Sequence, residues 1–155
     1  MDLKYAKPFI EATINVLSTM ANITPKAKKP YIKTSTKALG DVSGVVGFTT
    51  NDNKKGVMSV TFSKKCALQI VKNLLGDDIE NILEDVQDAV GEITNMISGQ
   101  ARAKLAEMGI SMAGATPTII MGDNHTISHL TKDKIMAVPF TTEYGDFVVE
   151  FSMSE

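Results

Sequence analysis

Apolar residues recur at three- and four-residue spacing over three stretches of the chain, which predicts three amphipathic helices. The longest stretch opens at Asp77 or Asp78 and runs to about Met108, where Gly109 is a natural stop. The other two stretches cover residues 5–22, with Pro8 in the first turn, and residues 64–75. The longest helix is the main candidate for a functional element, because its polar side carries unusual residues.

Six further segments are rich in apolar and β-branched residues and are bounded by turn signals such as Leu39-Gly40-Asp41, which predicts strands. The segments are 31–38, 42–50, 56–62, 111–121, 133–142 and 145–153. The resulting order is helix, three strands, two helices, three strands. It predicts a single α+β domain over residues 1–155, with a six-stranded, mostly antiparallel sheet and the two long helices on one face.

The same order divides into two halves, each a helix followed by three strands, which suggests a pseudo-duplicated fold. The first helix places Glu11 where the longest helix places Glu92. Three residues further on stands Ile14, and Asn15 is one position away. Only the second half would then keep a complete polar pair.

The polar side of the longest helix carries Glu92 and Asn95, which lie about 130° and 170° from the centre of the apolar stripe and within about 60° of each other. The same side also holds Asp88, Gly91, Ser98, Gly99 and Arg102. Each glycine there costs about 1 kcal/mol of helix propensity relative to alanine, and a glycine allows another backbone to come close. The pattern alone fits a solvated surface equally well, because polar pairs at this spacing are common on helices.

Composition narrows the possible functions. The 155 residues are 43% hydrophobic, enough for one core, and the net charge of −2 gives no strong attraction to nucleic acid or to a membrane surface. The lysines between residues 26 and 33 are expected to form a solvated loop, since the interleaved aromatics of a nucleic-acid site are missing. No stretch of 18 apolar residues and no signal peptide is found, so we expect a cytoplasmic protein without a membrane segment.

The other residue types that often form sites do not form a recognisable one in this sequence. Cys66 lies in an apolar run and is expected to be a buried small hydrophobe. The glycines between residues 40 and 47 do not form a phosphate-binding motif and are expected at bulges or close packings of a strand. His125 and His129 lack the spacing and the carboxylates of a metal site. We therefore expect no metal bound by this chain and no covalent nucleophile.

The segment Gly-Glu-Ile-Thr-Asn-Met-Ile-Ser-Gly at residues 91–99 resembles the Glu-x-x-Asn signature of the CheC/CheX/FliY phosphatases of bacterial chemotaxis. The small-residue continuation at 100–103, the segment Pro-Phe-Ile-Glu-Ala-Thr at 8–13, the glycine-rich strand at 40–47 and the closing strand pair also resemble the CheX layout. The resemblance therefore covers nearly the whole chain.

That resemblance implies hydrolysis of the aspartyl phosphate on a CheY-type response regulator. Asn95 would orient the attacking water, and Glu92 would pair with the regulator's lysine. The regulator would supply the Mg²⁺, so this chain would need no cofactor of its own. Gly91 and Gly99 would leave clearance for the partner, with Asp88, Ser98 and Arg102 as a polar rim. A homodimer is also implied, and the strand 147–153 is a candidate edge for it.

Two other classes of function stay open at this point. One is a non-catalytic module that recognises phosphorylated receiver domains through the same helix. The other is a structural component like the related flagellar switch proteins. The polar pair in a chain of this length favours the phosphatase, and turnover of phosphorylated regulator would separate it from a binding module.

Overall fold

The computed structural model describes residues 3–33, 37–76, 81–122, 125 and 135–153, which form one α+β domain. The expected fold class is confirmed, with three helices and a sheet whose strand pairings are all antiparallel within the described residues. The helices are α1 (Leu3–Met20), α2 (Lys64–Leu75) and α3 (Ile82–Glu107). The strands are β1 (Lys26–Ala27), β2 (Tyr31–Lys33), β3 (Val42–Thr50), β4 (Lys55–Phe62), β5 (Met112–Gly114), β6 (Thr118–Met121), β7 (Ile135–Thr142) and β8 (Gly145–Met153).

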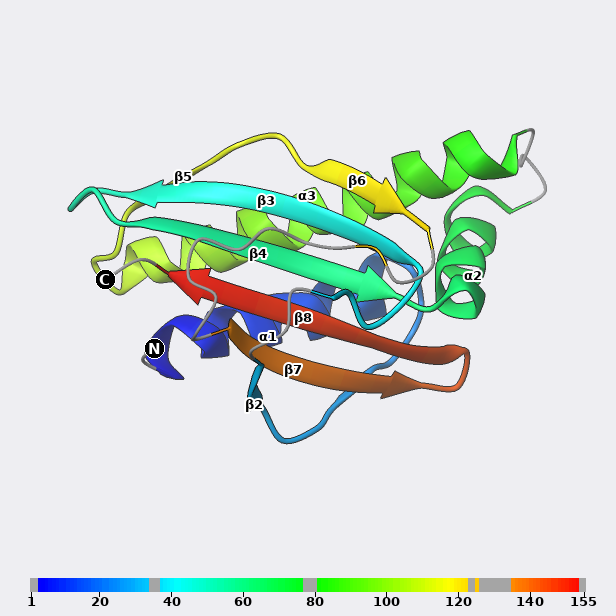
Figure 1. The fold of residues 1–155 in the computed structure, drawn as a ribbon, viewed down its shortest axis with the longest axis horizontal. Helices are drawn as coiled ribbons and strands as arrows, with labels where there is room; N and C mark the ends of the chain where they lie inside the picture. Colours follow the sequence, from blue (N-terminus) through cyan, green and yellow to red (C-terminus); the bar gives the residue numbers. More distant parts are fainter. Residues whose placement is uncertain (1–2, 34–36, 77–80, 123–124, 126–134, 154–155) are drawn as a thin grey trace.

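The sheet has eight strands in the order β1-β7-β8-β4-β3-β5, with β2 also on β7 and β6 also on β3 (Figure 1). The expected count of six is wrong because both outer strands are interrupted. The segment 111–121 divides into β5 and β6, and the short strand β1 precedes a β2 that ends at Lys33. The expected edge at 147–153 is also wrong, since β8 pairs with β4 on one side and with β7 on the other.

Each interrupted edge strand contains one residue more than the matching stretch of the strand with which it pairs. On β3, three steps separate Phe48 from Val45 (48 − 45), whereas four separate their partners Gly114 and Thr118 (118 − 114). On β7, three steps separate Phe140 from Ala137, whereas four separate their partners Ala27 and Tyr31. Both edges therefore carry a three-residue β-bulge, at 28–30 and at 115–117, and each bulge ends in a proline.

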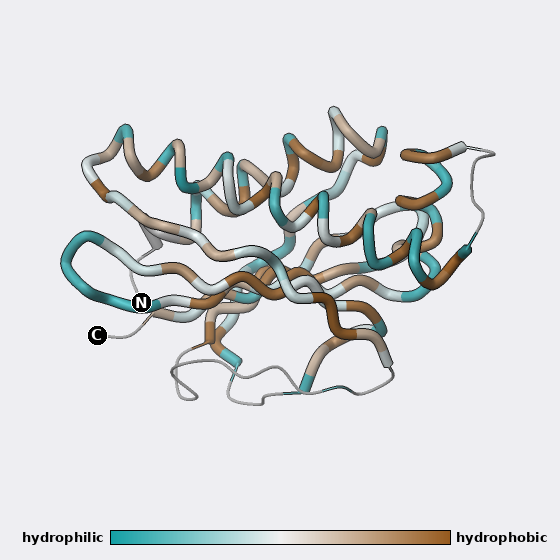
Figure 2. Tube along the Cα trace, turned by 90° about the horizontal axis from the view of Figure 1, so that it is seen from above, coloured by the Kyte–Doolittle hydropathy of each residue, from teal (hydrophilic) through white to brown (hydrophobic). Residues whose placement is uncertain are grey.

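Helices α1 and α3 lie on one face of the sheet, and the core fills the space between them and the strands (Figures 1 and 2). The ring of Phe9 on α1 contacts those of Phe48 and Phe151, with centroids 5.8 and 4.7 Å away. The apolar stripe of α3 is buried as expected at Val86, Val90, Ile93, Ile97 and Leu105 among others, whereas its end residues Ile82 and Met108 are exposed. Burial of this stripe leaves the opposite side of α3 facing outward.

A close packing at Gly44 sets the distance between α3 and the sheet. A Cβ placed on Gly44 would lie 2.0 Å from the hydroxyl oxygen of Thr94, so only glycine fits at this point of β3. Thr94 is fully buried, and its hydroxyl donates to the carbonyl of Val90 one turn earlier. The expected role of Gly44 as a close-packing strand glycine is confirmed, and it anchors the residue that precedes Asn95.

The opposite face of the sheet carries buried polar groups. The ammonium of Lys33 lies 2.5 Å from a carboxylate oxygen of Glu150, and both side chains are buried. The hydroxyl of Ser43 lies 2.6 Å from Thr61 Oγ1 and 2.6 Å from His125 Nε2. His125 thus takes part in an internal hydrogen-bond network, while His129 lies outside the described residues.

Two helix boundaries differ from the expectation. Helix α3 begins at Ile82, after Asn81, and not at Asp77 or Asp78, which lie outside the described residues. Helix α1 begins at Leu3, so Pro8 lies in its second turn and not in its first. The end of α3 is close to the expected position, with Met108 as the cap and Gly109 at a φ of 85°.

Candidate functional site

Local sequence signals place the start of α3. The side chain of Asn81 accepts a hydrogen bond from the backbone N–H of Glu84 and so satisfies one of the free donors of the first turn. Glu84 and Asp85 add negative charge in that turn, which favours the positive end of the helix dipole. The helix then continues for 26 residues, and its middle carries the polar pair.

Glu92 and Asn95 are both exposed. Among the described residues, neither side chain makes a hydrogen bond or an ion pair. An amide with free donors and a free acceptor can hold a water molecule, and a free carboxylate can pair with a cation from another molecule. Both groups are therefore available to a partner in the free protein.

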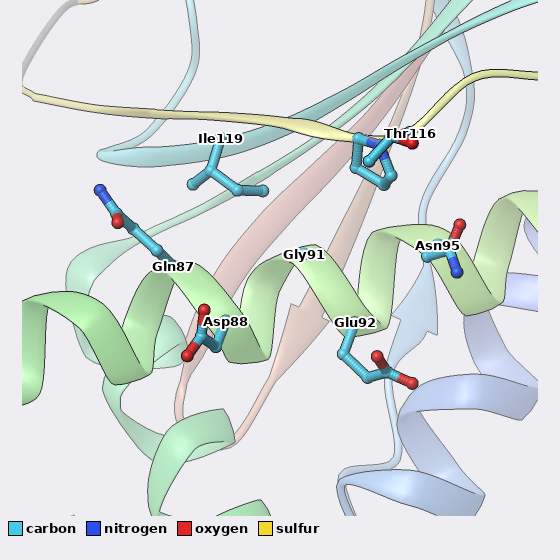
Figure 3. Close-up of a pocket in the computed structure, with 8 residues that line it drawn as sticks. Gln87, Asp88, Gly91, Glu92, Asn95, Thr116 and Ile119 are labelled. Atoms are coloured by element: carbon cyan, nitrogen blue, oxygen red, sulfur yellow. The ribbon is translucent and has the colours of Figure 1, made fainter.

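A groove of about 540 Å³ runs along this part of α3. One wall is α3 itself, with Gln87, Asp88, Gly91, Glu92 and Asn95 (Figure 3). The other wall is formed by Thr116 and Pro117 from the bulge and by Ile119 from β6. Figure 3 shows Thr116 and Ile119 above the helix, while Asp88 and Glu92 point to its other side. The polar pair thus borders a depression that is open to solvent.

The residues expected to surround Glu92 and Asn95 differ in their exposure and in their contacts. Asp88 is exposed and lines the groove, and Gly91 lines it beneath Ile119. No atom lies within 4 Å of a Cβ placed on Gly99, so this glycine faces open space. The expected exposure of Ser98 is wrong, since only 1% of it is accessible. Its hydroxyl accepts a hydrogen bond from Arg102 Nε at 3.3 Å, and Arg102 is itself half-buried.

The polar residues of α1 have internal partners. Glu11 lies 3.2 Å from the ammonium of Lys104 on α3 and 4.0 Å from that of Lys7. The side chain of Asn15 donates to Gln100 on α3 at 2.7 Å. These contacts join the two helices, so the polar residues of α1 are less available to a partner than those of α3.

The second wall of the groove is not evident from the sequence pattern. That pattern predicts one continuous strand over residues 111–121, which would leave no bulge to face α3. Pro117 is the signal that was available, because proline within a strand marks an edge or a bulge. The contact between that bulge and α3 depends on the sheet order, which the local pattern does not contain.

Other groups in the described part of the chain offer no competing site. Cys66 is fully buried, as expected, and burial raises the pKa of its thiol to about 11, so it stays protonated at neutral pH. Within the described residues, no cluster of three His, Cys, Asp or Glu side chains could hold a metal ion. The helices described here include none that is both long and apolar enough to span a bilayer.

Residues 42–141 match the family described as "Chemotaxis phosphatase CheX". This chain belongs to that family. The match includes the whole of α3 and both walls of the groove, and it favours the phosphatase over a structural component. The protein is accordingly a hydrolase.

Solved and curated relatives agree with this assignment. A chemotaxis protein CheX from Desulfovibrio desulfuricans is 58% identical, with a TM-score of 0.91 over 97% of this chain and 99% of that one. The CheY-P phosphatase CheX of Thermotoga maritima is 26% identical over 123 residues, which is 79% of this chain and 78% of the relative. The fold also matches, at 23% identity and a TM-score of 0.82, a protein from Borrelia burgdorferi whose structure is a CheX-CheY-BeF3-Mg²⁺ complex; the alignment covers 99% of this chain and 100% of that one.

Proposed function

We propose that this protein hydrolyses the aspartyl phosphate of a CheY-type response regulator, with α3 inserted beside the phosphorylated carboxylate. The observation that carries the proposal is the exposed pair of Glu92 and Asn95 on a helix whose position is fixed by its buried side. The named activity of the Thermotoga maritima relative supplies the substrate class.

Asn95 is assigned the role of orienting water. An amide is a poor acid or base, but its carbonyl oxygen and its N–H groups can hold a water molecule in one direction. The water oxygen attacks phosphorus, the bond from phosphorus to the aspartate oxygen breaks, and inorganic phosphate and a free carboxylate result. Because the carboxylate is already a good leaving group, catalysis needs orientation and charge stabilisation more than proton donation.

Glu92 is assigned the role of docking. Its free carboxylate lies one turn before Asn95, and we propose that it pairs with the lysine of the regulator's active site. Such a pair would fix the register of the helix, so that the amide of Asn95 reaches the phosphorus. Asp88, Gly91 and Gly99 lie along the same side of α3 and are proposed to contact the partner around this pair.

The Mg²⁺ is assigned to the regulator. A complex that contains both CheY and Mg²⁺ is known for the Borrelia burgdorferi relative. When bound there, the ion supplies charge stabilisation for the transferring phosphoryl group. The residues of this chain then only position the reacting groups. If positioning lowers the activation free energy by a few kcal/mol, the rate of hydrolysis rises by about two to three orders of magnitude.

We also infer that the two halves of the chain are related. Both edges of the sheet carry a three-residue bulge that ends in proline, and Thr13 and Thr94 each donate to a carbonyl one turn earlier. In this pairing Glu11 corresponds to Glu92, and Ile14 takes the place of Asn95.

A homodimer also stays a prediction, and it must use a surface other than an edge at β8.

Single-site variants test the assignment of Asn95. Asn95→Ala is expected to lower kcat for phosphate release by about two to three decades, while binding to the regulator stays measurable. The measurement is phosphate release from phosphorylated CheY at several concentrations, with many equivalents of regulator per phosphatase. Normal turnover by Asn95→Ala would remove the residue from the mechanism. Absence of turnover by the unmodified protein would favour a binding module.

Glu92→Ala is expected to change a different parameter. It should raise KM by about tenfold or more and change kcat less, because the loss of a docking pair weakens the complex before it affects the chemistry. Glu92→Gln keeps the shape of the side chain and removes its charge, so it serves as the matched variant. An unchanged affinity in both variants would refute the pairing with a lysine.

A further inference from the structure

The bulge at 115–117 is joined to α3 at both of its ends. Before the bulge, the guanidinium of Arg102 lies over Gly114, where an added Cβ would come within 2.9 Å of its Cζ and Nε atoms. After the bulge, Ile119 lies against Gly91, where an added Cβ would meet the Ile119 Cδ1 atom at 3.7 Å. The two contact points on α3 lie one turn before Asn95 and about two turns after it.

Arg102 is held in this position by more than one contact. Its Nε donates to the hydroxyl of the buried residue Ser98 one turn earlier, and the arginine is half-buried. Gly114 has no Cβ, so its backbone leaves room for the planar guanidinium. The bulge itself is tied to the sheet by the N–H of Ala115, which donates to the carbonyl of Gly47 at 3.0 Å.

The first half of the chain has a matching bulge but lacks the arginine and the glycine. The residue before its bulge is Ala27, which carries a Cβ where Gly114 has none. The position that corresponds to Arg102, counted from Glu11 as Arg102 is from Glu92, is the buried residue Ala21. The arginine and its glycine therefore occur together only in the half that carries Asn95.

We propose that Arg102 is a positioning residue, and that the bulge 115–117, which it fixes against α3, is a second contact wall for the phosphorylated regulator. Thr116 and Pro117 then touch the segment of the regulator that enters beside Asn95, and they set the width of the groove. This inference rests on the proposed function, because it assigns a second part of the same docking site.

Three variants test it. Arg102→Ala is expected to raise KM for phosphorylated CheY about tenfold while kcat changes less than about twofold, because the wall acts on docking. Arg102→Lys should resemble Arg102→Ala, since an ammonium cannot lie flat on Gly114. Gly114→Ala should raise KM as well, because its Cβ displaces the guanidinium. Lys104→Ala, which removes a cation of α3 that faces α1, is the matched control and should leave KM unchanged.

The double variant decides whether the two residues act through each other. In the Arg102→Ala background, Gly114→Ala is expected to add no further loss, because the group that its Cβ displaces is already absent. If the effects of the two single variants on KM add in the double variant, the proposal that Arg102 acts through Gly114 is wrong. A normal KM in Arg102→Lys would overturn it too, because the charge alone would then suffice.

Binding separates this inference from the proposed function. Affinity for CheY loaded with beryllofluoride and Mg²⁺ is measured by titration for every variant, with circular dichroism as the check of folding. A tenfold weaker affinity in Arg102→Ala supports the wall even if Asn95→Ala still turns over, in which case only the assigned chemistry fails. If Arg102→Lys and Gly114→Ala both bind with unchanged affinity, the bulge is not a contact wall, whether or not Asn95→Ala still turns over.

Discussion

At the scale of single residues, the outward face of α3 is poorly suited to stabilising a helix. Asparagine and glycine have lower helix propensity than the lysine or glutamate that usually cover a solvated face, and this face carries Asn95, Gly91 and Gly99. In the described part of the chain, the side chain of Asn95 makes no hydrogen bond or ion pair that would offset the cost. Residues that destabilise a helix and make no stabilising interaction within the chain are best explained by a role in binding a partner protein.

Gly99 allows this explanation to be tested. An alanine fits there, because nothing lies within 4 Å of the added Cβ, so Gly99→Ala should stabilise the free protein by up to about 1 kcal/mol. The same methyl group should raise KM for phosphorylated regulator if the glycine leaves room for it. Urea denaturation and phosphate release measure the two effects. A more stable variant with normal KM would show that the partner does not need this space.

At the scale of elements, the site depends on how closely α3 approaches β3. Gly44 and Thr94 meet where the helix crosses the strand, and Asn95 is the next residue on the helix. The polar pair is therefore placed by a buried contact on the other side of the helix. A change in that contact should be transmitted to the groove.

Gly44→Ala is expected to lower the free energy of unfolding by about 1–3 kcal/mol, because its Cβ would overlap the Thr94 side chain and force the helix to move. We also expect a lower kcat, since a small displacement of Asn95 misaligns the water. Thr94→Ala removes the atoms that clash and should restore most of the stability in the double variant. If the double variant is no more stable than Gly44→Ala alone, the contact between Gly44 and Thr94 does not set the distance between α3 and β3.

At the scale of the whole molecule, the sheet separates two polar regions. The groove on α3 is open, whereas Lys33 and Glu150 on the other face are buried together. Burial raises the pKa of Glu150, and Lys33 acts in the opposite direction. A folded-state pKa above the unfolded one means that the folded protein binds the extra proton, so stability falls as pH rises from the ordinary carboxyl value through the raised one.

Lys33→Met should enlarge this pH dependence. Without the ammonium, the ionised carboxylate of Glu150 loses a buried cation, and we expect a loss of about 3 kcal/mol at about pH 8. The loss should shrink at about pH 4, where Glu150 is protonated. Denaturation at both pH values measures it, and kcat at low temperature should stay normal because the sheet lies between the pair and the groove. A loss that does not vary with pH would assign the effect to packing and not to charge.

The sequence by itself determined the elements and the candidate pair. Periodicity of apolar residues placed all three helices, because burial of one side leaves a repeat of about 3.6 residues. The resemblance of residues 91–99 to a known signature then selected Glu92 and Asn95. Local patterns could do this because secondary structure and short motifs are local properties of the chain.

Only the tertiary structure decided what surrounds that pair. Ser98 was expected on the exposed polar side of the helix but is buried, and its hydroxyl accepts a hydrogen bond from Arg102. The guanidinium of Arg102 in turn lies over Gly114, on a strand that follows α3 in the chain. The position of β8 inside the sheet and the bulge opposite Asn95 depend on which strands become neighbours. Strand order is set by the packing of the whole core, and no short window of sequence contains it.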